Sequence, residues 1–349
     1  MGYYNWNDTF GYQADVTMVV GARGLGKTYG LREQFLRDAE KGWRFVQAVR
    51  YKAEVAPICA DYFGKVLERN DKYRNGYDFK YEGGKAFWRR KGEGSKAPFE
   101  CIGYIVPLTS LQLTKQTTYH RVKRIAMDEA ILDKRDRYHG YLASEYTLLA
   151  DLVDSCTRQN PNDGETDPVY LYLLANALDL VNPYFVRYGI KDVPPEGYSW
   201  HDGKHMLLHY VKDADYGTAK QTDTLAGRML AGTKEGALAA FNDFSQSDLS
   251  AIKKKPKHAN WEFGINLNGK VYGIWYDSVE GFYHISYKHL ESPIFTLTLA
   301  DGSPDYISIR RRKRELETFI DLGAYGMFRY DSPEIQQDFL RGLALYGFR

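Results

Sequence analysis

The chain has 349 residues, of which 44% are hydrophobic and 26% charged, a balance that indicates a globular protein of about two domains and excludes a disordered or fibrous one. No apolar run approaches the roughly 20 residues that a membrane span requires, so we expect no membrane partner. The net charge of +2 does not by itself indicate nucleic-acid binding, and three scattered cysteines with no signal-peptide pattern favour the cytoplasm.

The first predicted strand, residues 16–20, leads into residues 21–28, which read GARGLGKT and fit the phosphate-loop pattern G-x-x-x-x-G-K-[ST]. A helix is predicted over 28–41. Glycines let the backbone aim its N–H groups at phosphate oxygens, and the helix adds its positive N-terminal end. A chance glycine-rich turn is the alternative, but the strand and helix argue against it. We therefore predict that ATP is bound by Gly21, Ala22, Arg23, Gly24, Leu25, Gly26, Lys27 and Thr28.

Two of these loop residues carry specific chemistry. Lys27 is expected to reach the β- and γ-phosphates, and the Thr28 hydroxyl to hold Mg²⁺. Further along the chain, the predicted strands and helices alternate. They are strands at 44–50, 77–81, 85–89, 101–106, 122–127 and 169–175, and helices at 53–70 and 141–157. Apolar strands that alternate with helices predict an α/β fold with a parallel sheet covered on both faces.

An acidic pair follows the apolar strand at 122–127, as the Walker B part of a nucleotide site requires. Asp128 is predicted to hold Mg²⁺, and Glu129 to act as the general base for the attacking water. Asn176, at the end of the next strand, is a candidate to orient that water, although a turn or cap role is equally open. Arg158 is a candidate for stabilising transition-state charge at a neighbouring subunit, with a plain surface arginine as the alternative.

The second part of the chain has a different pattern. A Pro-Gly turn at 194–197 suggests a domain edge, and 198–250 is predicted to be a helical linker. Strands are then predicted at 261–267, 270–276 and 281–287, with Asn268-Gly269 as a hairpin turn, and helices at 309–322 and 332–346. Two basic clusters, 253–257 and 310–314, are dense enough to meet a phosphate backbone, and are otherwise solvated surface.

The chain resembles the DNA-packaging (encapsidation) ATPases of small podoviruses of the phi-29 group. The resemblance rests on the phosphate loop, the Asp128–Glu129 pair, and several segments in the family's order, which are Arg50-Tyr51-Lys52, 105–108, 176–185, 227–233 and the 268–275 hairpin. It implies an ASCE-type P-loop ATPase domain over 1–197, a small helical linker over 198–250, and an α+β, ribonuclease-H-like, degenerate nuclease domain over 251–349. The last domain is expected to contact DNA and the portal.

The resemblance also implies a function and partners. It implies a homo-oligomeric ring, expected to be a pentamer, that docks on the procapsid portal in the host cytoplasm and couples ATP hydrolysis to translocation of double-stranded DNA. A packaging RNA is a further partner that the resemblance leaves open. By position, Arg158 would be an arginine finger acting in trans, Lys52 would lie near the neighbour's nucleotide, and the DNA-contacting residues would be Lys115, Lys134 and Arg135.

Nuclease activity is not expected from the C-terminal region. Two-metal hydrolysis needs several carboxylates that converge on ions about 4 Å apart. The first strand there offers Asn266 in place of an acid, and Asp277 and Glu280 look isolated. The rival functions are a P-loop DNA helicase or recombination-type motor, a structural nucleotide clamp, and a metabolite kinase.

Overall fold

The computed structural model describes residues 4–92, 94, 97–111, 119–132, 140–142, 145–157, 168–177, 180–190, 192–233, 251–297 and 304–348, with the backbone alone at 214–215 and 304–313. The chain divides into two compact units, each described here by itself. The first comprises Met1–Asp133, Tyr146–Leu178 and Asp192–Ser245, and the second Lys134–Glu145, Asp179–Lys191 and Gln246–Arg349.

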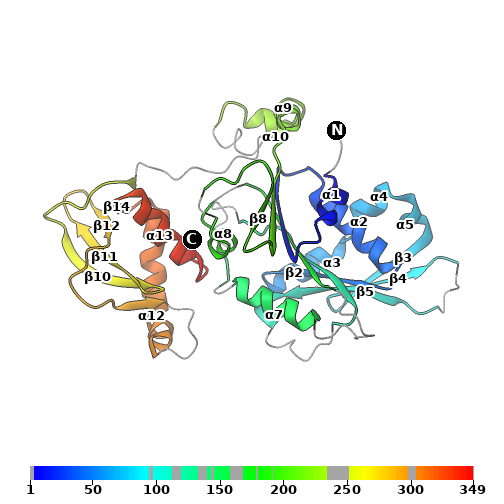
Figure 1. The fold of residues 1–349 in the computed structure, drawn as a ribbon, viewed down its shortest axis with the longest axis horizontal. Helices are drawn as coiled ribbons and strands as arrows, with labels where there is room; N and C mark the ends of the chain where they lie inside the picture. Colours follow the sequence, from blue (N-terminus) through cyan, green and yellow to red (C-terminus); the bar gives the residue numbers. More distant parts are fainter. Residues whose placement is uncertain are drawn as a thin grey trace. The chain divides into compact units, whose positions relative to one another are not determined.

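The first unit is built on a nine-stranded sheet with the order β3-β4-β5-β2-β6-β7-β1-β9-β8 (Figure 1). The strands are β1 (Val16–Val20), β2 (Arg44–Val49), β3 (Tyr77–Glu82), β4 (Lys85–Arg90), β5 (Glu100–Pro107), β6 (Val122–Met127), β7 (Tyr170–Ala175), β8 (Gly197–His201) and β9 (Met206–Tyr210). The run from β5 to β9 is parallel throughout, whereas β3, β4 and β8 pair antiparallel at the two edges. The parallel strands are apolar because helices cover both of their faces.

Helices α1, α2, α4 and α5 lie on one side of this sheet and α7 on the other (Figure 1). The helical elements of the unit are α1 (Trp6–Gly11), α2 (Lys27–Ala39), η1 (Lys52–Glu54), α3 (Val55–Ala60), α4 (Gly64–Arg69), α5 (Asp71–Gly76), η2 (Leu108–Ser110), α7 (Glu145–Thr157), α9 (Ala214–Asp223) and α10 (Leu225–Met229). Its core contains a stack in which the Phe45 ring lies 4.7 Å from Phe35 and 5.2 Å from Tyr62, all parallel. The stack fixes α2 against β2 through buried aromatic area.

The second unit contains a five-stranded sheet with the order β13-β10-β11-β12-β14. Its elements are α8 (Pro183–Arg187), β10 (Asn260–Leu267), β11 (Lys270–Asp277), β12 (Phe282–Ser286), β13 (Phe295–Leu297), α12 (Pro304–Ala324), β14 (Phe328–Tyr330) and α13 (Pro333–Ala344). β10, β11 and β12 form an antiparallel meander, and the short strands β13 and β14 add to its edges in parallel. Ile335, Phe339 and Leu343 of α13 are buried at intervals of four residues, so one face of this helix packs into the core.

Most predicted elements are confirmed, and the differences have physical causes. The helix predicted over 53–70 is wrong as one element, because η1, α3 and α4 divide that segment. The parallel sheet is mixed at its edges. The prediction that the chain is helical from 198 is also wrong over 198–210, where β8 and β9 extend the first sheet beside β1. The linker boundary expected at 197 therefore falls within the first unit, because buried β9 follows a polar turn that hides its apolar pattern.

Candidate functional site: the phosphate loop and its partners

The phosphate loop lies at the end of β1, an interior strand of the first sheet between β7 and β9. Gly21 N–H donates to Ala175 O at the end of β7, at 3.0 Å, so the loop starts from a fixed point between two parallel strands. Gly24 and Gly26 have φ values of 99° and 82°, which favour glycine because a Cβ is strained there. Gly26 is the N-cap of α2, and the loop therefore leads directly into the N-terminal end of that helix.

The N-terminal segment holds this loop from the outside. Tyr4 N–H donates to Leu25 O at 2.8 Å, and the Trp6 indole N–H donates to Lys27 O at 2.9 Å. A Cβ at Gly30 would lie 2.4 Å from the Trp6 ring, so the ring packs against bare α2 backbone. Sequence reasoning assigned no role to this segment, which sets the position of the first turn of α2.

Lys27 is buried at the centre of the loop, with a residue exposure of 7%. Its ammonium donates to Gly21 O at 2.6 Å, to Ala22 O at 3.0 Å and to Asn176 Oδ1 at 3.4 Å. Burial lowers the pKa of Lys27 to about 8, a shift that Asp128 opposes and the nearby cations Lys220 and Arg23 reinforce. Three acceptors therefore hold the ammonium in place, and Asn176 comes from the strand end where the sequence predicted it.

Thr28 and Asp128 meet although they come from different parts of the sheet. The Thr28 hydroxyl donates to Asp128 Oδ2 at 2.8 Å, and Asp128 Oδ1 accepts from Glu129 N–H at 3.0 Å. β7 lies between β1 and β6 in the sheet, so an additional strand separates the two halves of the site. A hydroxyl and a carboxylate in contact are oxygen ligands of the kind that hold Mg²⁺ together with phosphates and water, so this pair fits the ion.

Glu129 is held in an uncommon backbone conformation at the end of β6, with φ of 52°. Its Oε1 accepts from Arg23 Nη2 of the phosphate loop at 3.3 Å, and both side chains are more than 60% exposed. An ion pair this exposed contributes about 0–1 kcal/mol, so it restrains the carboxylate only weakly. The structure thus places Glu129 beside the loop with its side chain able to turn.

Arg50, at the end of β2, is a site residue whose role the sequence reasoning missed. It is 5% exposed, and its guanidinium donates to Glu129 O at 3.0 Å and Ala130 O at 2.9 Å. These bonds fix the backbone that carries the acidic pair. The sequence offered an arginine at a strand end, within the segment Arg50-Tyr51-Lys52 that contributes to the resemblance, but not its partner, which is set by the pairing of β2 with β6.

Of the remaining predicted site residues, the structure describes Lys52. Lys52 in η1 is exposed and lines a cavity of about 950 Å³ formed with α3, the β3–β4 hairpin and β5, rather than the phosphate loop. The predicted finger and the predicted DNA-contacting residues, which are Arg158, Lys115, Lys134 and Arg135, lie outside the described residues. No helix in the described part of the chain is long and apolar enough to span a bilayer.

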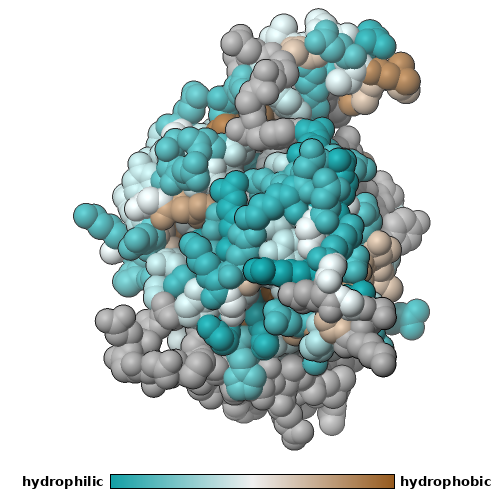
Figure 2. All heavy atoms as spheres, turned by 90° about the vertical axis from the view of Figure 1, so that its right-hand side faces the viewer, coloured by the Kyte–Doolittle hydropathy of each residue, from teal (hydrophilic) through white to brown (hydrophobic). Residues whose placement is uncertain are grey.

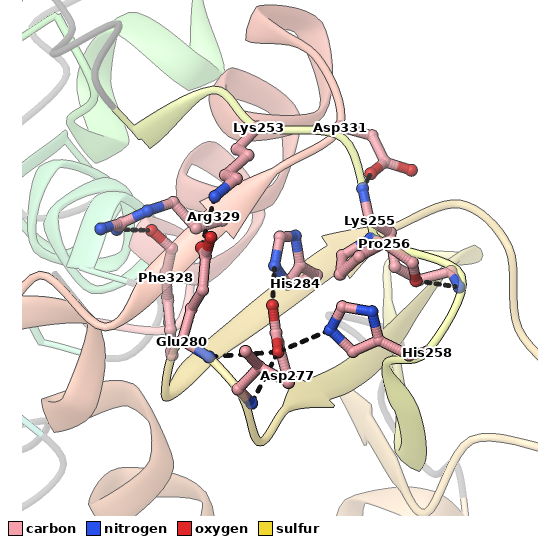
Figure 3. A network of polar contacts seen from close by, with 11 residues as sticks. Lys253, Lys255, Pro256, His258, Asp277, Glu280, His284, Phe328, Arg329 and Asp331 are labelled. Carbon is pink, nitrogen blue, oxygen red and sulfur yellow. Dashed lines mark hydrogen bonds and ion pairs between the residues drawn. The ribbon is translucent and has the colours of Figure 1, made fainter.

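The second unit contains a polar network around Asp277 at the end of β11 (Figure 3). Asp277 is buried, and its Oδ1 accepts from His258 at 2.9 Å and from two backbone N–H groups of the following turn. Buried His284 lies on the other side, with Nε2 3.9 Å from Asp277 Oδ2, and burial lowers the pKa of this histidine. The expectation that Asp277 and Glu280 are isolated is therefore wrong: Asp277 has these partners, and Glu280 pairs with Lys253.

These contacts give the acids of the second unit partners other than a metal ion. Among the residues that the structure describes, no three His, Cys, Asp or Glu side chains are arranged to hold a metal ion. Asn266 Oδ1 accepts from Gly269 N–H at 2.8 Å and so belongs to the hairpin turn. In the basic segment 253–257, Lys255 Nζ lies 4.1 Å from the centre of the Trp275 ring, so this cation is partly engaged within the chain.

Curated relatives of this chain match it over nearly its whole length. The DNA packaging protein of Bacillus phage phi29 is 26% identical over 342 residues, 96% of this chain and 95% of that protein. The DNA packaging protein of Bacillus phage B103 is 26% identical over 326 residues, 92% of this chain and 94% of that protein.

Solved structures show the same fold. A chain of the bacteriophage Phi-29 viral genome packaging motor assembly matches with a TM-score of 0.55 at 22% identity, over 98% of this chain and 99% of that one. A chain of the Phi-28 gp11 DNA packaging motor matches with a TM-score of 0.60 at 19% identity, over 98% of both chains. The family model described as Podovirus DNA encapsidation protein (Gp16) matches residues 1–341. The chain therefore belongs to the family of podovirus DNA encapsidation proteins.

Proposed function

We propose that this encapsidation protein hydrolyses ATP with Mg²⁺ at the phosphate loop, and that hydrolysis drives double-stranded DNA into a procapsid. The observation that carries the proposal is the 2.8 Å contact between Thr28 and Asp128, which joins a phosphate loop to an acidic strand end across an intervening strand. Family membership supports the packaging role, and the alternative of a helicase or recombination-type motor has no support among the relatives.

In this proposal, each described residue of the site has a separate role. The loop N–H groups and the Lys27 ammonium bind the β- and γ-phosphates, since a charged phosphate oxygen is a stronger acceptor than the carbonyls that Lys27 now contacts. Thr28 and Asp128 would hold Mg²⁺, which neutralises charge on the phosphate oxygens. Glu129 takes the proton of the attacking water, and the weak contact with Arg23 lets its carboxylate turn toward that water. Asn176 is placed to orient the water or to sense the γ-phosphate.

The assembly is the second part of the proposal. We assign Arg158 as a finger in trans, Lys52 to a subunit boundary, and Lys115, Lys134 and Arg135 to the DNA in the pore of a ring, which we take to be a pentamer. Such contacts are to phosphates, so they carry no base readout, as a sequence-blind motor requires. The ring would act in the host cytoplasm, docked on the procapsid portal, and a packaging RNA is a further partner to test.

The second unit is proposed to contact DNA or the portal without cleaving DNA. Asp277 and Glu280 are engaged with histidine, backbone N–H groups and lysine, so they are poor candidates for binding two metal ions. Incubation of the full chain with supercoiled plasmid and Mg²⁺ or Mn²⁺ tests this, and nicked or linear product would contradict the assignment.

The test of the ATPase is Glu129→Gln, with Glu68→Gln on exposed α4 as a matched control. Glu129→Gln should bind ATP and lose steady-state turnover by at least 100-fold, while the control keeps the wild-type rate. Normal hydrolysis by Glu129→Gln would refute the assignment. For the trans role, mixed rings of Arg158→Ala and Glu129→Gln subunits should regain part of the activity, because some interfaces then hold both groups.

A further inference from the structure

Helix α9 lies directly on the phosphate loop, although it is almost 200 residues away in the sequence. The Tyr216 hydroxyl donates to Arg23 O at 2.9 Å, and Lys220 Nζ donates to the same oxygen at 3.2 Å. A Cβ at Gly24 would lie 2.1 Å from the Tyr216 hydroxyl oxygen, so the tyrosine occupies the space beside this glycine, whose φ of 99° already disfavours other residues. The loop and α9 are therefore fitted to each other.

Three cations gather at this point of the molecule. Burial, followed by the charge of Arg23, lowers the pKa of Lys220, and Lys220 in turn contributes to the lowered pKa of Lys27. The described carboxylates beside them are Glu129, which pairs with Arg23, and Asp128, which bonds to Thr28. Like charges held this close are unfavourable without an anion. The triphosphate of ATP supplies that negative charge, and Lys220 is placed to share in binding it.

Helix α9 is attached to the first unit by polar contacts rather than by a hydrophobic core. Among the described side chains of 211–233, no apolar one is buried, and Leu225, Met229 and Leu230 at α10 are exposed by 68%, 74% and 40%. Figure 2 shows a largely hydrophilic face with apolar side chains at its upper end, the height at which α9 and α10 lie. Each hydrogen bond to Arg23 O contributes only about 1 kcal/mol. Contacts this weak can be exchanged when a ligand enters.

We propose that α9 is the nucleotide-responsive element of the site: Lys220 moves its hydrogen bond from the Arg23 carbonyl to a phosphate oxygen of bound ATP, and the α9–α10 segment moves with it. The exchange is favourable because a bond between an ammonium and a phosphate is charge-assisted at both ends. Lys27 makes the same exchange from Gly21 O and Ala22 O, so both lysines respond to one ligand. The inference rests on the proposed function, since it concerns the same nucleotide.

The first experiment measures affinity for a fluorescent ATP analogue. Lys220→Ala should raise its Kd about 5- to 10-fold and Lys220→Arg should restore most of the affinity. Lys41→Ala, which removes an equal charge beyond the far end of α2, should have no effect. Tripolyphosphate should compete less well in Lys220→Ala by the same factor, because the contact is to phosphate. Equal Kd values for Lys220→Ala and wild type would overturn the proposal.

The second experiment separates this inference from the proposed function. Hydrogen exchange of the full Glu129→Gln chain is followed with and without ATP. We expect ATP to change exchange in both the phosphate loop, 21–28, and α9, 216–223, and the α9 change to be lost when Lys220→Ala is added. A response confined to 21–28 would overturn the role of α9 alone. No response in either segment would refute nucleotide binding itself.

Discussion

Lys27 carries a cost in stability that its function requires, and the structure gives the size of that cost. The ammonium is buried, and its pKa falls from 10.5 to about 8. This interval corresponds to about 3 kcal/mol by which burial disfavours the charged form. Replacement by methionine, of similar length and apolar, removes that penalty. The change removes the ammonium bonds to Gly21 O and Ala22 O, at about 1 kcal/mol each, and the longer contact with Asn176 Oδ1.

The expected balance is a Lys27→Met variant that is about 1 kcal/mol more stable than wild type at pH 7, although it no longer binds ATP. In a domain of 150–250 residues this corresponds to a rise in Tm of about 2–4 °C. The sign of the pH dependence follows from proton binding. Between pH 8 and 10.5 the unfolded wild-type chain keeps a proton that the folded chain has released, so wild-type stability rises with pH relative to the variant. The advantage of methionine should therefore be largest at pH 7, fall to zero at about pH 9 and turn into a disadvantage by pH 10, where the lost hydrogen bonds outweigh the relieved charge penalty.

Thermal unfolding of both proteins from pH 7 to pH 10, with Lys41→Met as the exposed-lysine control, measures this difference. Each pair is compared at the same pH, so the titration of other groups cancels. A variant that is less stable at pH 7, or a difference that stays constant up to pH 10, would show that the buried ammonium is not the source of the cost.

Three further predictions follow from the contacts around the two units. Arg50→Met should lower the free energy of unfolding by about 2–4 kcal/mol and reduce ATP turnover, because the backbone that carries the acidic pair loses two buried donors. Denaturant titration and an ATPase assay measure these effects, and an unchanged unfolding midpoint would contradict the prediction. EDTA should abolish ATP turnover. In a Mg²⁺ titration, Asp128→Asn should raise the Mg²⁺ concentration needed for half-maximal activity at least 10-fold. Equal half-maximal Mg²⁺ concentrations for variant and wild type would exclude this carboxylate as a ligand. Burial alone would raise the pKa of Asp277, but bonds from His258 and two backbone N–H groups outweigh it and lower the pKa from 3.8. The ionised carboxylate therefore stabilises the folded chain, and this contribution to the free energy of unfolding is lost as pH falls below about 4. In Asp277→Asn, stability should depend less on pH in this range. Acid unfolding monitored by tryptophan fluorescence measures this, and an acid transition identical to that of wild type would refute the role of Asp277.

The sequence was sufficient for the parts of the site that are local in the chain. The phosphate loop is one continuous segment whose glycines and lysine have a single geometric use, and the acidic pair follows a strand that is plainly apolar. Their contact across β7 needed only the rule that parallel strands present the same ends at one edge of the sheet. Element boundaries within the sheet were predicted for the same reason, since strands such as β1 and β6 are buried on both faces.

The parts that were missed depend on which distant segments meet. Arg50 contacts the backbone of Glu129 because β2 pairs with β6, and the sequence around Arg50 does not indicate that pairing. Tyr216 and Lys220 lie on an exposed, polar helix whose composition is that of a linker, so their contact with Arg23 leaves no periodic signal. The short strands β13 and β14, three residues each, carry too few positions for alternation to show.

The contacts of Tyr4 and Trp6 have a practical consequence for laboratory work on this chain. Since these residues hold the phosphate loop and the first turn of α2, a purification tag at the N-terminus is attached only a few residues ahead of these contacts. Rate constants measured on such a fusion would include any effect of the tag on the phosphate loop. A tag at the opposite terminus, joined beyond α13, begins in the other unit, which does not contain the phosphate loop.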